Sequence, residues 1–495
     1  MTRPGGRPTV WVAPAIGALA FACRLYPVLH GGGLHGLAGY DDGVYYSAAD
    51  AVVAGQVPYR DFVLLHPPGL IYLLTPFAAL GHVIGDANGW AVARLAMMAV
   101  GALSAVLVFL VGRRFGLVAA IGGGLLYAVW VPAINGETST FLECVPNALL
   151  LTALLLLGSR RTARSSGLPL LAGAALGLAT SIKIWGVVPL LVVLGWQLLA
   201  AGWRRAATVL AGSVAAAVVV CGVPFALAPG RMTVLVIRDQ LQRSGVHTAL
   251  LDRAADFTPV HRLLPHAGSA LELAAVILVG LVGVLAAVLA SQDPRARVFV
   301  ALLVAQGAVL CGSPPYFTHY GAFLAPAVVL TGAVGAQRVA DRLAVRASGW
   351  RPVAIGLMGG LVALAAVPVV THPSFIRVDS QRIQAAVADR RCVSADSPAV
   401  LALAGVLTRN LDRGCPTRID VSGVTYNVDR VVGSNGRSVP RARNSLWQRD
   451  VMAYLLSGQA AITTRSAVNG LSRTELRELA RKGVLYRGNG ITVYG

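Results

Sequence analysis

Two adjacent carboxylates, Asp41 and Asp42, open the most polar segment of the chain. A carboxylate pair suits a general base, a divalent-metal ligand, or both. The alternative is a helix cap, because Asp42 precedes an amphipathic run over residues 44–53 and Asp is a preferred N-cap residue. Polar, aromatic and proline residues surround the pair, and this density favours a functional role. Arg60 and His66 in the same segment are expected to contact a substrate.

Lys183 is the only lysine before residue 482, and it lies between two apolar segments. An ionisable residue in such a place is a functional candidate, although a lysine at a helix end can also extend its ammonium group to the membrane interface. Glu137 and Glu143 offer further acidic groups for an acceptor or a metal ion. The alternative is that both belong to a solvated loop.

The sequence assigns no cofactor. Nine histidines are present, but no metal-ligand spacing such as His-Glu-x-x-His occurs. Whether a divalent metal ion binds is left open by the sequence, and Asp42 is the candidate ligand.

The elements that position these residues are apolar. Hydrophobic residues make up 56% of the chain and charged residues 13%, with a mean hydropathy of +0.66, whereas soluble proteins carry about 25% charge. Stretches of the roughly 20 apolar residues that a bilayer requires recur up to residue 371. The sequence predicts a polytopic α-helical membrane domain over residues 1–371, with about eleven spanning helices at 9–29, 89–112, 115–134, 141–158, 167–182, 185–201, 205–227, 269–290, 297–312, 320–337 and 352–371.

The distribution of arginine predicts the orientation of these helices. With a cytoplasmic N-terminus and alternating helices, fifteen arginines fall on the cytoplasmic side. The outer segments before residue 372 hold little beyond Arg60, Arg94 and Lys183, as the positive-inside rule requires, if the long loop over 228–268 is excluded. That loop carries five arginines against the trend. The segment 69–85 is apolar enough for a short span, but counting it would invert every later helix. We therefore expect a juxtamembrane or re-entrant helix there, within one long outer loop over 30–88. The cytoplasmic arginines are Arg3, Arg7, Arg113, Arg114, Arg160, Arg161, Arg164, Arg204, Arg205, Arg295, Arg297, Arg338, Arg342, Arg346 and Arg351.

Residues 372–495 have the composition of a soluble domain, which this orientation places outside the cytoplasm. Cys392 and Cys415 both lie in it, and outside the cytoplasm a disulfide between them is expected, with two unpaired thiols as the alternative. The local patterns predict a compact α/β domain, with strands at 393–396 and 460–464, helices at 398–412, 444–457 and 472–482, and a hairpin over 484–494.

The net charge of +20 does not require a nucleic-acid partner. Of the 42 basic residues, 24 precede residue 372, mostly in short clusters between apolar stretches. Cytoplasmic loops between membrane helices explain these clusters better than nucleic-acid binding does. We therefore expect the protein to lie in the lipid bilayer of the plasma membrane.

Three motifs together resemble the GT-C glycosyltransferases, in the branch of protein O-mannosyltransferases, aminoarabinose transferases and actinobacterial mannosyl- and arabinosyltransferases. The first is the acidic pair after the first helix, followed by an amphipathic juxtamembrane helix and a second one that starts with His66-Pro-Pro-Gly. The second is Gly177-Leu-Ala-Thr-Ser-Ile-Lys183, and the third is Tyr316-Phe-Thr-His319-Tyr320. The resemblance covers most of residues 1–340.

This resemblance implies a polyprenyl-phosphate sugar donor and an acceptor hydroxyl on a cell-envelope glycan, lipid or protein. Asp41 is then the expected base, with Asp42 as its alternate or a metal ligand, and Lys183 is the expected phosphate contact, with His319 and Tyr316 as neighbours. The rival interpretations are a transporter or flippase of lipid-linked sugars, which would need polar residues near the bilayer midplane, and a noncatalytic envelope scaffold.

Overall fold

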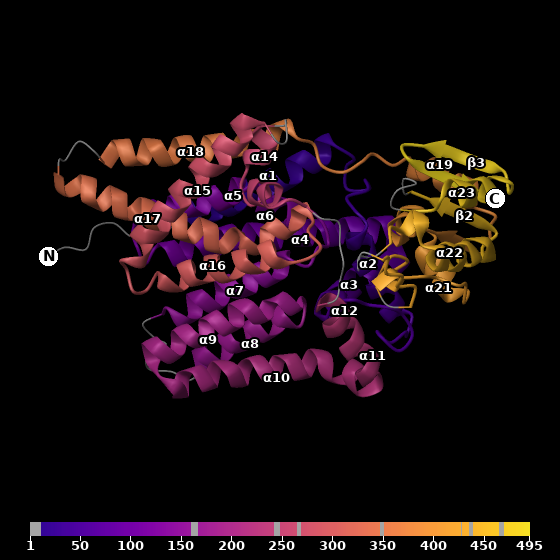
Figure 1. The fold of residues 1–495 in the computed structure, drawn as a ribbon, viewed down its shortest axis with the longest axis horizontal. Helices are drawn as coiled ribbons and strands as arrows, with labels where there is room; N and C mark the ends of the chain where they lie inside the picture. The colour runs from indigo at the N-terminus through magenta and orange to yellow at the C-terminus, as the bar shows by residue number, and fades with distance from the viewer. Residues whose placement is uncertain are drawn as a thin grey trace. The chain divides into compact units, whose positions relative to one another are not determined.

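The computed structural model describes residues 11–159, 167–241, 248–264, 269–346, 351–426, 428–434, 439–464 and 470–495, and most of them are helical (Figure 1). Of the arginines expected in the cytoplasm, Arg3, Arg7, Arg160, Arg161 and Arg164 lie outside the described residues. Each predicted apolar stretch forms a helix or a broken helix close to its predicted bounds. The predicted helical fold is thereby confirmed.

Six described helical segments are long and apolar enough to cross a membrane: Val12–His30, Asp86–Gly112, Ile184–Ala201, Trp203–Leu227, Ala270–Ser291 and Thr318–Leu343. A seventh is broken, with its two parts, Val118–Val129 and Val131–Glu137, bent by 56°. The other apolar helices are shorter: Gly69–Ile84, Cys144–Leu157, Gly167–Thr180, Arg297–Gly312 and Ile355–Thr371. The chain is a multi-pass membrane protein.

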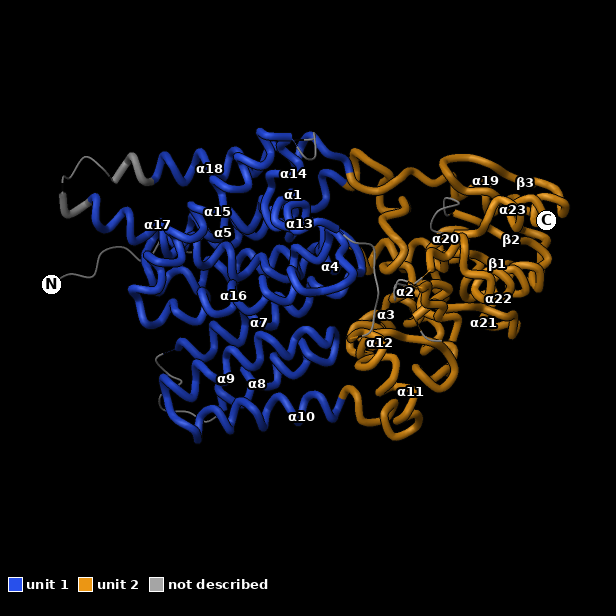
Figure 2. The backbone as a smooth tube through the Cα atoms, viewed as in Figure 1, with its two compact units in different colours: residues 1–27, 96–219, 246–373 blue, residues 28–95, 220–245, 374–495 orange. Residues whose placement is uncertain are grey.

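The chain divides into two compact units, which Figure 2 shows in different colours. Unit 1 comprises residues 1–27, 96–219 and 246–373. Its core is built from small and branched apolar side chains of several helices, including Ile16, Val108 and Leu330. Its elements are η1 (Val118–Gly122), α5 (Gly123–Val129), α6 (Val131–Glu137), α7 (Cys144–Leu157), α8 (Gly167–Thr180), η3 (Ile184–Gly186), α9 (Val187–Ala201), α13 (Leu250–Asp256), α14 (Val260–Leu263), α15 (Ala270–Ser291), α16 (Arg297–Gly312), η5 (Thr318–Leu324), α17 (Ala325–Arg346) and α18 (Arg351–Thr371).

Three helices contribute to both units: α1 (Val12–His30), α4 (Asp86–Gly112) and α10 (Trp203–Leu227). Unit 2 comprises residues 28–95, 220–245 and 374–495. It therefore contains the predicted outer loop and nearly all of the predicted C-terminal domain. The loop forms α2 (Asp41–Val53) and α3 (Gly69–Ile84), and the middle segment forms α11 (Pro229–Thr233), η4 (Val234–Arg238) and α12 (Asp239–Leu241).

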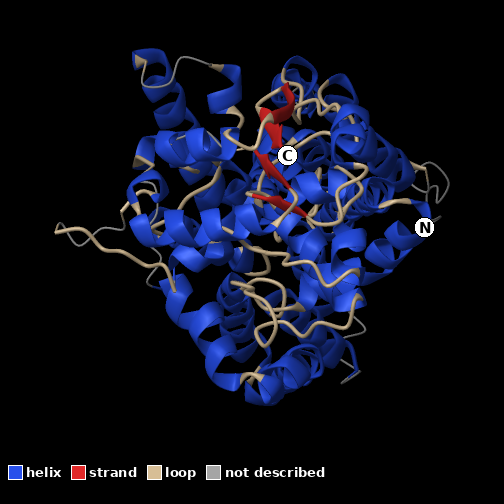
Figure 3. Ribbon diagram, turned by 90° about the vertical axis from the view of Figure 1, so that its right-hand side faces the viewer, coloured by secondary structure: helices blue, strands red, loops and turns tan. Residues whose placement is uncertain are grey.

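The C-terminal part of unit 2 contains one small sheet, seen in Figure 3, with the strand order β1-β2-β4-β3. Strand β1 (Val393–Ala395) pairs in parallel with β2 (Ala460–Thr463), and β4 (Ile491–Tyr494) pairs antiparallel with both β2 and β3 (Val484–Gly488). Around it lie α19 (Ser380–Val387), α20 (Pro398–Leu403), α21 (Leu407–Asp412), η7 (Gly423–Tyr426), η8 (Arg441–Arg443), α22 (Ser445–Ser457) and α23 (Arg473–Ala480).

Local signals in the sequence position these elements. The Asn444 side chain caps α22, and the Ser472 hydroxyl accepts a hydrogen bond from the Glu475 amide at the start of α23, which confirms both predicted helix starts. The predicted helix over 398–412 is wrong in one respect, because it is two helices with a turn at Gly405. That residue has φ +63°, a left-handed conformation that glycine adopts readily and that ends α20.

The predicted disulfide between Cys392 and Cys415 is present, with 5.6 Å between the Cα atoms. It joins the residue before β1 to the turn after α21. In the same unit, backbone hydrogen bonds pair Leu37 of the outer loop with Ile376 of the C-terminal part. The outer loop and the sheet-containing segment are therefore packed as one body.

Candidate active site

Lys183 forms a buried ion pair with Glu143. Its Nζ lies 2.5 Å from Oε1 of Glu143, and the two side chains are 4% and 1% exposed. Lys183 follows α8, while Glu143 directly precedes α7, so the pair joins the ends of two helices that pack against each other. The ammonium group does not extend to solvent, and Glu143 does not lie in a solvated loop.

Aromatic rings surround the Lys183 ammonium. Nζ lies 4.0 Å from the ring centre of Tyr320 and 4.2 Å from that of Trp185. Both distances suit cation–π attraction, which is strongest where water is excluded. Within unit 1, Glu143 and these two rings thus surround the Lys183 ammonium group.

The other two predicted phosphate neighbours belong to the same cluster through Tyr320. The His319 ring lies 4.9 Å from the Tyr320 ring and stacks on Phe141 at 4.6 Å, and the Tyr316 ring lies 6.2 Å from Tyr320. Tyr316 is buried, and among the described residues its hydroxyl has no hydrogen-bond partner. The structure thus brings Lys183, His319 and Tyr316 together.

Two buried amides fix the short 3-10 helix that carries His319 and Tyr320. Asn147 donates to the Ala322 carbonyl at 2.7 Å, and Gln306 donates to the Phe323 carbonyl at 2.9 Å. These bonds satisfy carbonyl groups of η5 that a membrane interior would otherwise leave unpaired. They anchor η5 to α7 and α16.

Glu137 is fully buried and forms an ion pair with Arg24 of α1. Its second oxygen accepts a hydrogen bond from Tyr127 at 2.8 Å, and Arg24 also donates to the carbonyls of Ala20 and Ala128. Both carboxylate oxygens are thus bound within the protein. Glu137 thereby holds α1 against α5 and α6, and its predicted contact with a substrate stays a prediction.

The acidic pair occupies the first turn of α2. The residue at the N-cap position is Tyr40, with no side-chain cap, so Asp42 does not cap the helix. Asp42 is fully buried and lies 3.2 Å from Nη2 of Arg94, while Asp41 is half-buried. The two carboxylates therefore differ in role: Asp42 is held inside the protein, and Asp41 is the one with an accessible face.

Arg94 is buried, and its guanidinium contacts several groups that lead into α2. Its guanidinium donates to the carbonyls of Leu34 and Gly36 as well as to Asp42. It stacks on Trp90, with 3.8 Å from Cζ to the ring centre. A planar guanidinium serves such divided contacts better than an ammonium. Arg94 thus fixes the segment of the outer loop, residues 34–42, that leads into α2.

Gly43 lets α2 approach α20 closely. A Cβ atom at this position would lie 2.6 Å from the Cα of Ala399, which is inside van der Waals contact. Most of α2 is buried, and α2 packs against α3 and α20. The residue after the acidic pair therefore sets the position of the first turn against the C-terminal segment.

The remaining outer-loop candidates lie in the turn before α3. Arg60 is half-exposed and pairs with Asp61 at 2.8 Å, and its carbonyl accepts a hydrogen bond from Arg231. The Arg60 side chain and the Val57 amide lower the pKa of Asp61 to about 2. His66 is buried, and its carbonyl accepts a hydrogen bond from the Tyr59 hydroxyl at 2.8 Å. Arg60 is the more accessible of the two predicted substrate contacts.

Among the described residues no group of three or more His, Cys, Asp or Glu side chains is arranged to hold a metal ion. The three acidic candidates from the sequence, Asp42, Glu137 and Glu143, are each paired with a cationic side chain, and a metal ion beside that side chain would be repelled. The arrangement offers acid–base and charge chemistry from its own side chains.

The sequence alone does not single out Arg94, Arg24, Trp185 or the role of Tyr320. A signal for both arginines exists, because each interrupts an apolar helix, and a charged residue inside a membrane segment is retained only with a partner. Which acidic residue pairs with which arginine depends on how distant helices pack.

Comparison with solved structures identifies the architecture. No protein family model matches the sequence, and no curated protein aligns with it significantly. Solved structures do match: ArnT from Cupriavidus metallidurans, bound to undecaprenyl phosphate, superposes with a TM-score of 0.59 over 99% of this chain and 98% of that one, at 18% identity. The chain has the fold of the GT-C glycosyltransferases.

A second match with the GT-C fold comes from an archaeon. The oligosaccharyltransferase AglB from Archaeoglobus fulgidus, in complex with an inhibitory peptide and a dolichol-phosphate, gives a TM-score of 0.58 at 13% identity and covers 92% of this chain and 69% of that one. The predicted resemblance to this fold is confirmed. Sequence identities of 18% and 13% establish the fold but not the reaction, which depends on the residues of this chain.

Proposed function

We propose that this chain is a glycosyltransferase that moves a sugar from a polyprenyl-phosphate donor to a hydroxyl of a cell-envelope glycan, lipid or protein. The observation that carries the proposal is the GT-C fold over nearly the whole chain, shared with ArnT bound to undecaprenyl phosphate and AglB bound to a dolichol-phosphate. The arginine pattern supports a cytoplasmic N-terminus. With that orientation, the acidic pair, Lys183 and residues 372–495 would face outward from the plasma membrane.

Asp41 is our general base. A bond forms between the acceptor oxygen and the anomeric carbon, the bond from that carbon to the phosphate oxygen breaks, and the acceptor proton passes to the Asp41 carboxylate. A lipid phosphate leaves as a stable anion, so a strong general acid is unnecessary. Asp42, held by Arg94, positions the first turn of α2 from which Asp41 projects.

Lys183 is our contact for the departing phosphate. A cation placed where negative charge develops stabilises the transition state most where water is excluded, and the surroundings of Lys183 are buried and aromatic. Without donor, Glu143 compensates the lysine charge. On donor binding, the phosphate takes over that charge, and Glu143 becomes available to a hydroxyl of the sugar. His319 and Tyr316 border the same position.

The test is a transfer assay with the full chain in nanodiscs. Radiolabelled decaprenyl-phosphate mannose and decaprenyl-phosphate arabinose are offered with mixed envelope acceptors, which covers the hexose and pentose branches that the sequence resembles. The expected result is labelled acceptor with wild type and at least a 100-fold loss with Asp41→Asn. Glu478→Gln, which changes an exposed acid of α23, is the control and should retain transfer.

Two outcomes would overturn the proposal. Full activity of Asp41→Asn would remove the base from this residue. Carriage of intact lipid-linked sugar across a vesicle membrane, with no label on any acceptor, would establish the transporter instead.

A further inference from the structure

Asp86 caps a helix that belongs to a distant part of the sequence. Its Oδ2 accepts hydrogen bonds from the backbone amides of Leu407 at 2.8 Å and Thr408 at 3.2 Å, at the start of α21. The helix has no side-chain cap of its own, because Val406 stands at the N-cap position. The first amides of a helix need such an acceptor. Asp86, the first residue of α4, therefore supplies the N-terminal cap that α21 lacks.

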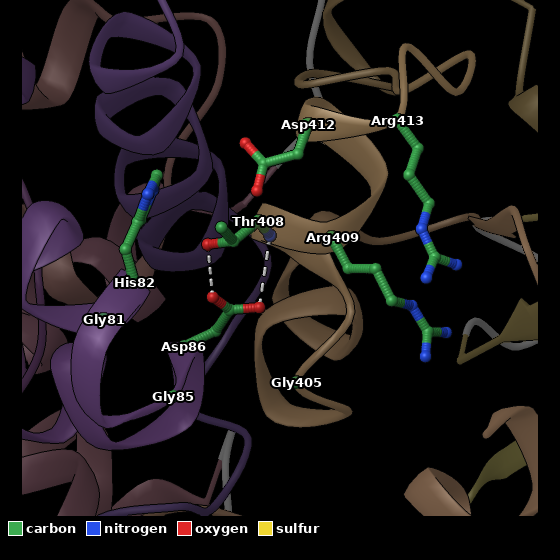
Figure 4. A pocket seen from close by; sticks show the side chains of 9 residues that line it. All are labelled: Gly81, His82, Gly85, Asp86, Gly405, Thr408, Arg409, Asp412 and Arg413. Carbon is green, nitrogen blue, oxygen red and sulfur yellow. Dashed lines mark hydrogen bonds between the residues drawn. The ribbon is translucent and has the colours of Figure 1, made fainter.

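The Thr408 hydroxyl lies between two carboxylates. Its Oγ1 is 2.5 Å from Oδ1 of Asp86 and 3.2 Å from Oδ2 of Asp50, and Figure 4 shows the contacts to Asp86. A hydroxyl has one hydrogen to donate. If that hydrogen bonds to Asp86, the contact with Asp50 is a hydrogen bond only when Asp50 itself carries a proton. Asp50 and Asp86 are 1% and 4% exposed, so water does not relieve this demand.

His82 completes the cluster from α3. Its Nε2 lies 2.6 Å from Oδ1 of Asp50, so the cluster joins α2, α3 and α4 to α21. The cluster borders a cavity of about 390 Å³. In Figure 4 the guanidinium groups of Arg409 and Arg413 point away from Asp86, and they donate to carbonyls of residues 387–391. Among the described residues, His82, Asp86 and Tyr46 are the ionisable groups that interact with Asp50. Arg409 interacts with Asp86, and Asp412 and Arg413 line the same cavity.

We propose that Asp50, His82, Asp86 and Thr408 form a proton-dependent clasp, which fastens the C-terminal segment to the outer-loop helices while a proton is bound and loosens when that proton is lost. The same helix α2 carries Asp41 and Asp42 at its other end. The clasp goes beyond the proposed reaction and does not depend on it. On the proposed topology it would respond to the pH outside the cell.

The direction of the pH response follows from the Asp50 carboxyl. Burial and the nearby Asp86 raise its pKa to about 6, against the opposing effects of the hydrogen bonds with His82 and Thr408. In an opened clasp Asp50 is solvated and regains a pKa of about 4. The fastened state then binds more protons than the opened state. Fastening is complete below about pH 4, weakens as the pH rises through about 6, and is constant above that. Two pKa units correspond to a change of about 100-fold in the opening equilibrium.

Hydrogen exchange on the full chain in nanodiscs measures this equilibrium. The peptides measured span residues 404–413 and contain Leu407 and Thr408, whose amides donate hydrogen bonds to Asp86. Their protection factors, corrected for the intrinsic exchange rate at each pH, give the opening constant. For wild type we expect opening to rise up to about 100-fold between pH 4 and pH 7. Asp50→Asn should abolish this response, because its amide donates to Thr408 and accepts from His82 at every pH. Asp61→Asn, on the same loop, should respond like wild type.

A wild-type opening constant that is equal at pH 4 and pH 7 would overturn the clasp, and so would an unchanged response in Asp50→Asn. Protection of α22 (Ser445–Ser457) verifies that each variant is folded. If Asp50→Asn does not fold, Asp50→Ser decides, because it also removes the carboxyl that titrates: it should lose the response. Thr408→Ser, which keeps the shared hydroxyl, should respond like wild type. Retention of the response by Asp50→Ser would refute the proposal. No sugar donor enters this experiment, so its failure is separate from that of the proposed reaction.

Discussion

Replacing Lys183 with Met separates the structural role of this residue from its proposed role in catalysis. Methionine has a similar length and no charge. The substitution leaves the Glu143 carboxylate buried, with its Oε1 deprived of the ammonium and its Oε2 already without a hydrogen-bond partner among the described residues. The matched variant, Glu143→Gln, removes the opposite charge, and the double variant removes both.

The burial of the pair determines the size of the effect. Removing one partner of a buried ion pair typically destabilises a protein by about 3–5 kcal/mol, whereas replacing both partners is often close to neutral. Loss of the contacts to Trp185 and Tyr320 adds about 1 kcal/mol to the Lys183 variants. We therefore expect each single variant to be destabilised by about 3 kcal/mol or more, and the double variant Lys183→Met/Glu143→Gln by about 1–2 kcal/mol.

Two assays on the same proteins test this reasoning. Unfolding in mixed micelles gives the coupling free energy of the pair through a double-mutant cycle. Native mass spectrometry with polyprenyl phosphate gives binding, which should fall about 10- to 100-fold in both Lys183 variants, since a hydrogen bond to a charged group contributes about 1.5–3 kcal/mol. A double variant that recovers stability and also binds the lipid like wild type would refute the phosphate role. A Lys183→Met protein as stable as wild type would refute the structural one.

Further predictions concern the other anchors. Arg94→Leu should lower the rate of transfer about 100-fold, because it releases the buried Asp42, and Arg94→Lys should lower the rate less. Steady-state rates with saturating donor measure the difference, and equal rates in the two variants would contradict the prediction. The double variant Cys392→Ser/Cys415→Ser should destabilise the C-terminal segment by about 3 kcal/mol, since the bridge closes a loop with a sequence separation of 23 residues. Limited proteolysis under non-reducing conditions would detect the loosened segment, and wild-type resistance would count against a stabilising bridge.

Much of the fold is predictable because its signals are local. Apolar runs of spanning length fix the membrane helices, and the capping residues Asn444 and Ser472 fix the starts of α22 and α23. The prediction of one helix over 398–412 is wrong because a single left-handed glycine, Gly405, outweighs the helical propensity around it. A glycine in an apolar run does not by itself reveal a positive φ.

The site is less predictable because its contacts are long-range. Lys183 is conspicuous as a lone lysine, but its partner Glu143 lies 40 positions earlier in the sequence. The capping of α21 by Asp86 spans 321 positions. Glu137 illustrates the consequence: its charge marks it as important, but only the packing of α1 reveals that its partner is Arg24, 113 positions earlier.

The release of free polyprenyl phosphate tests the central claim most directly. Purified protein in nanodiscs is mixed with decaprenyl-phosphate sugar and acceptor, and mass spectrometry follows both the lipid and the glycosylated product. Glycosyl transfer predicts that wild type releases polyprenyl phosphate in equal amount to the glycosylated acceptor, while Asp41→Asn and Lys183→Met release neither. An unchanged donor pool with wild type, for both mannose and arabinose donors, would contradict the account.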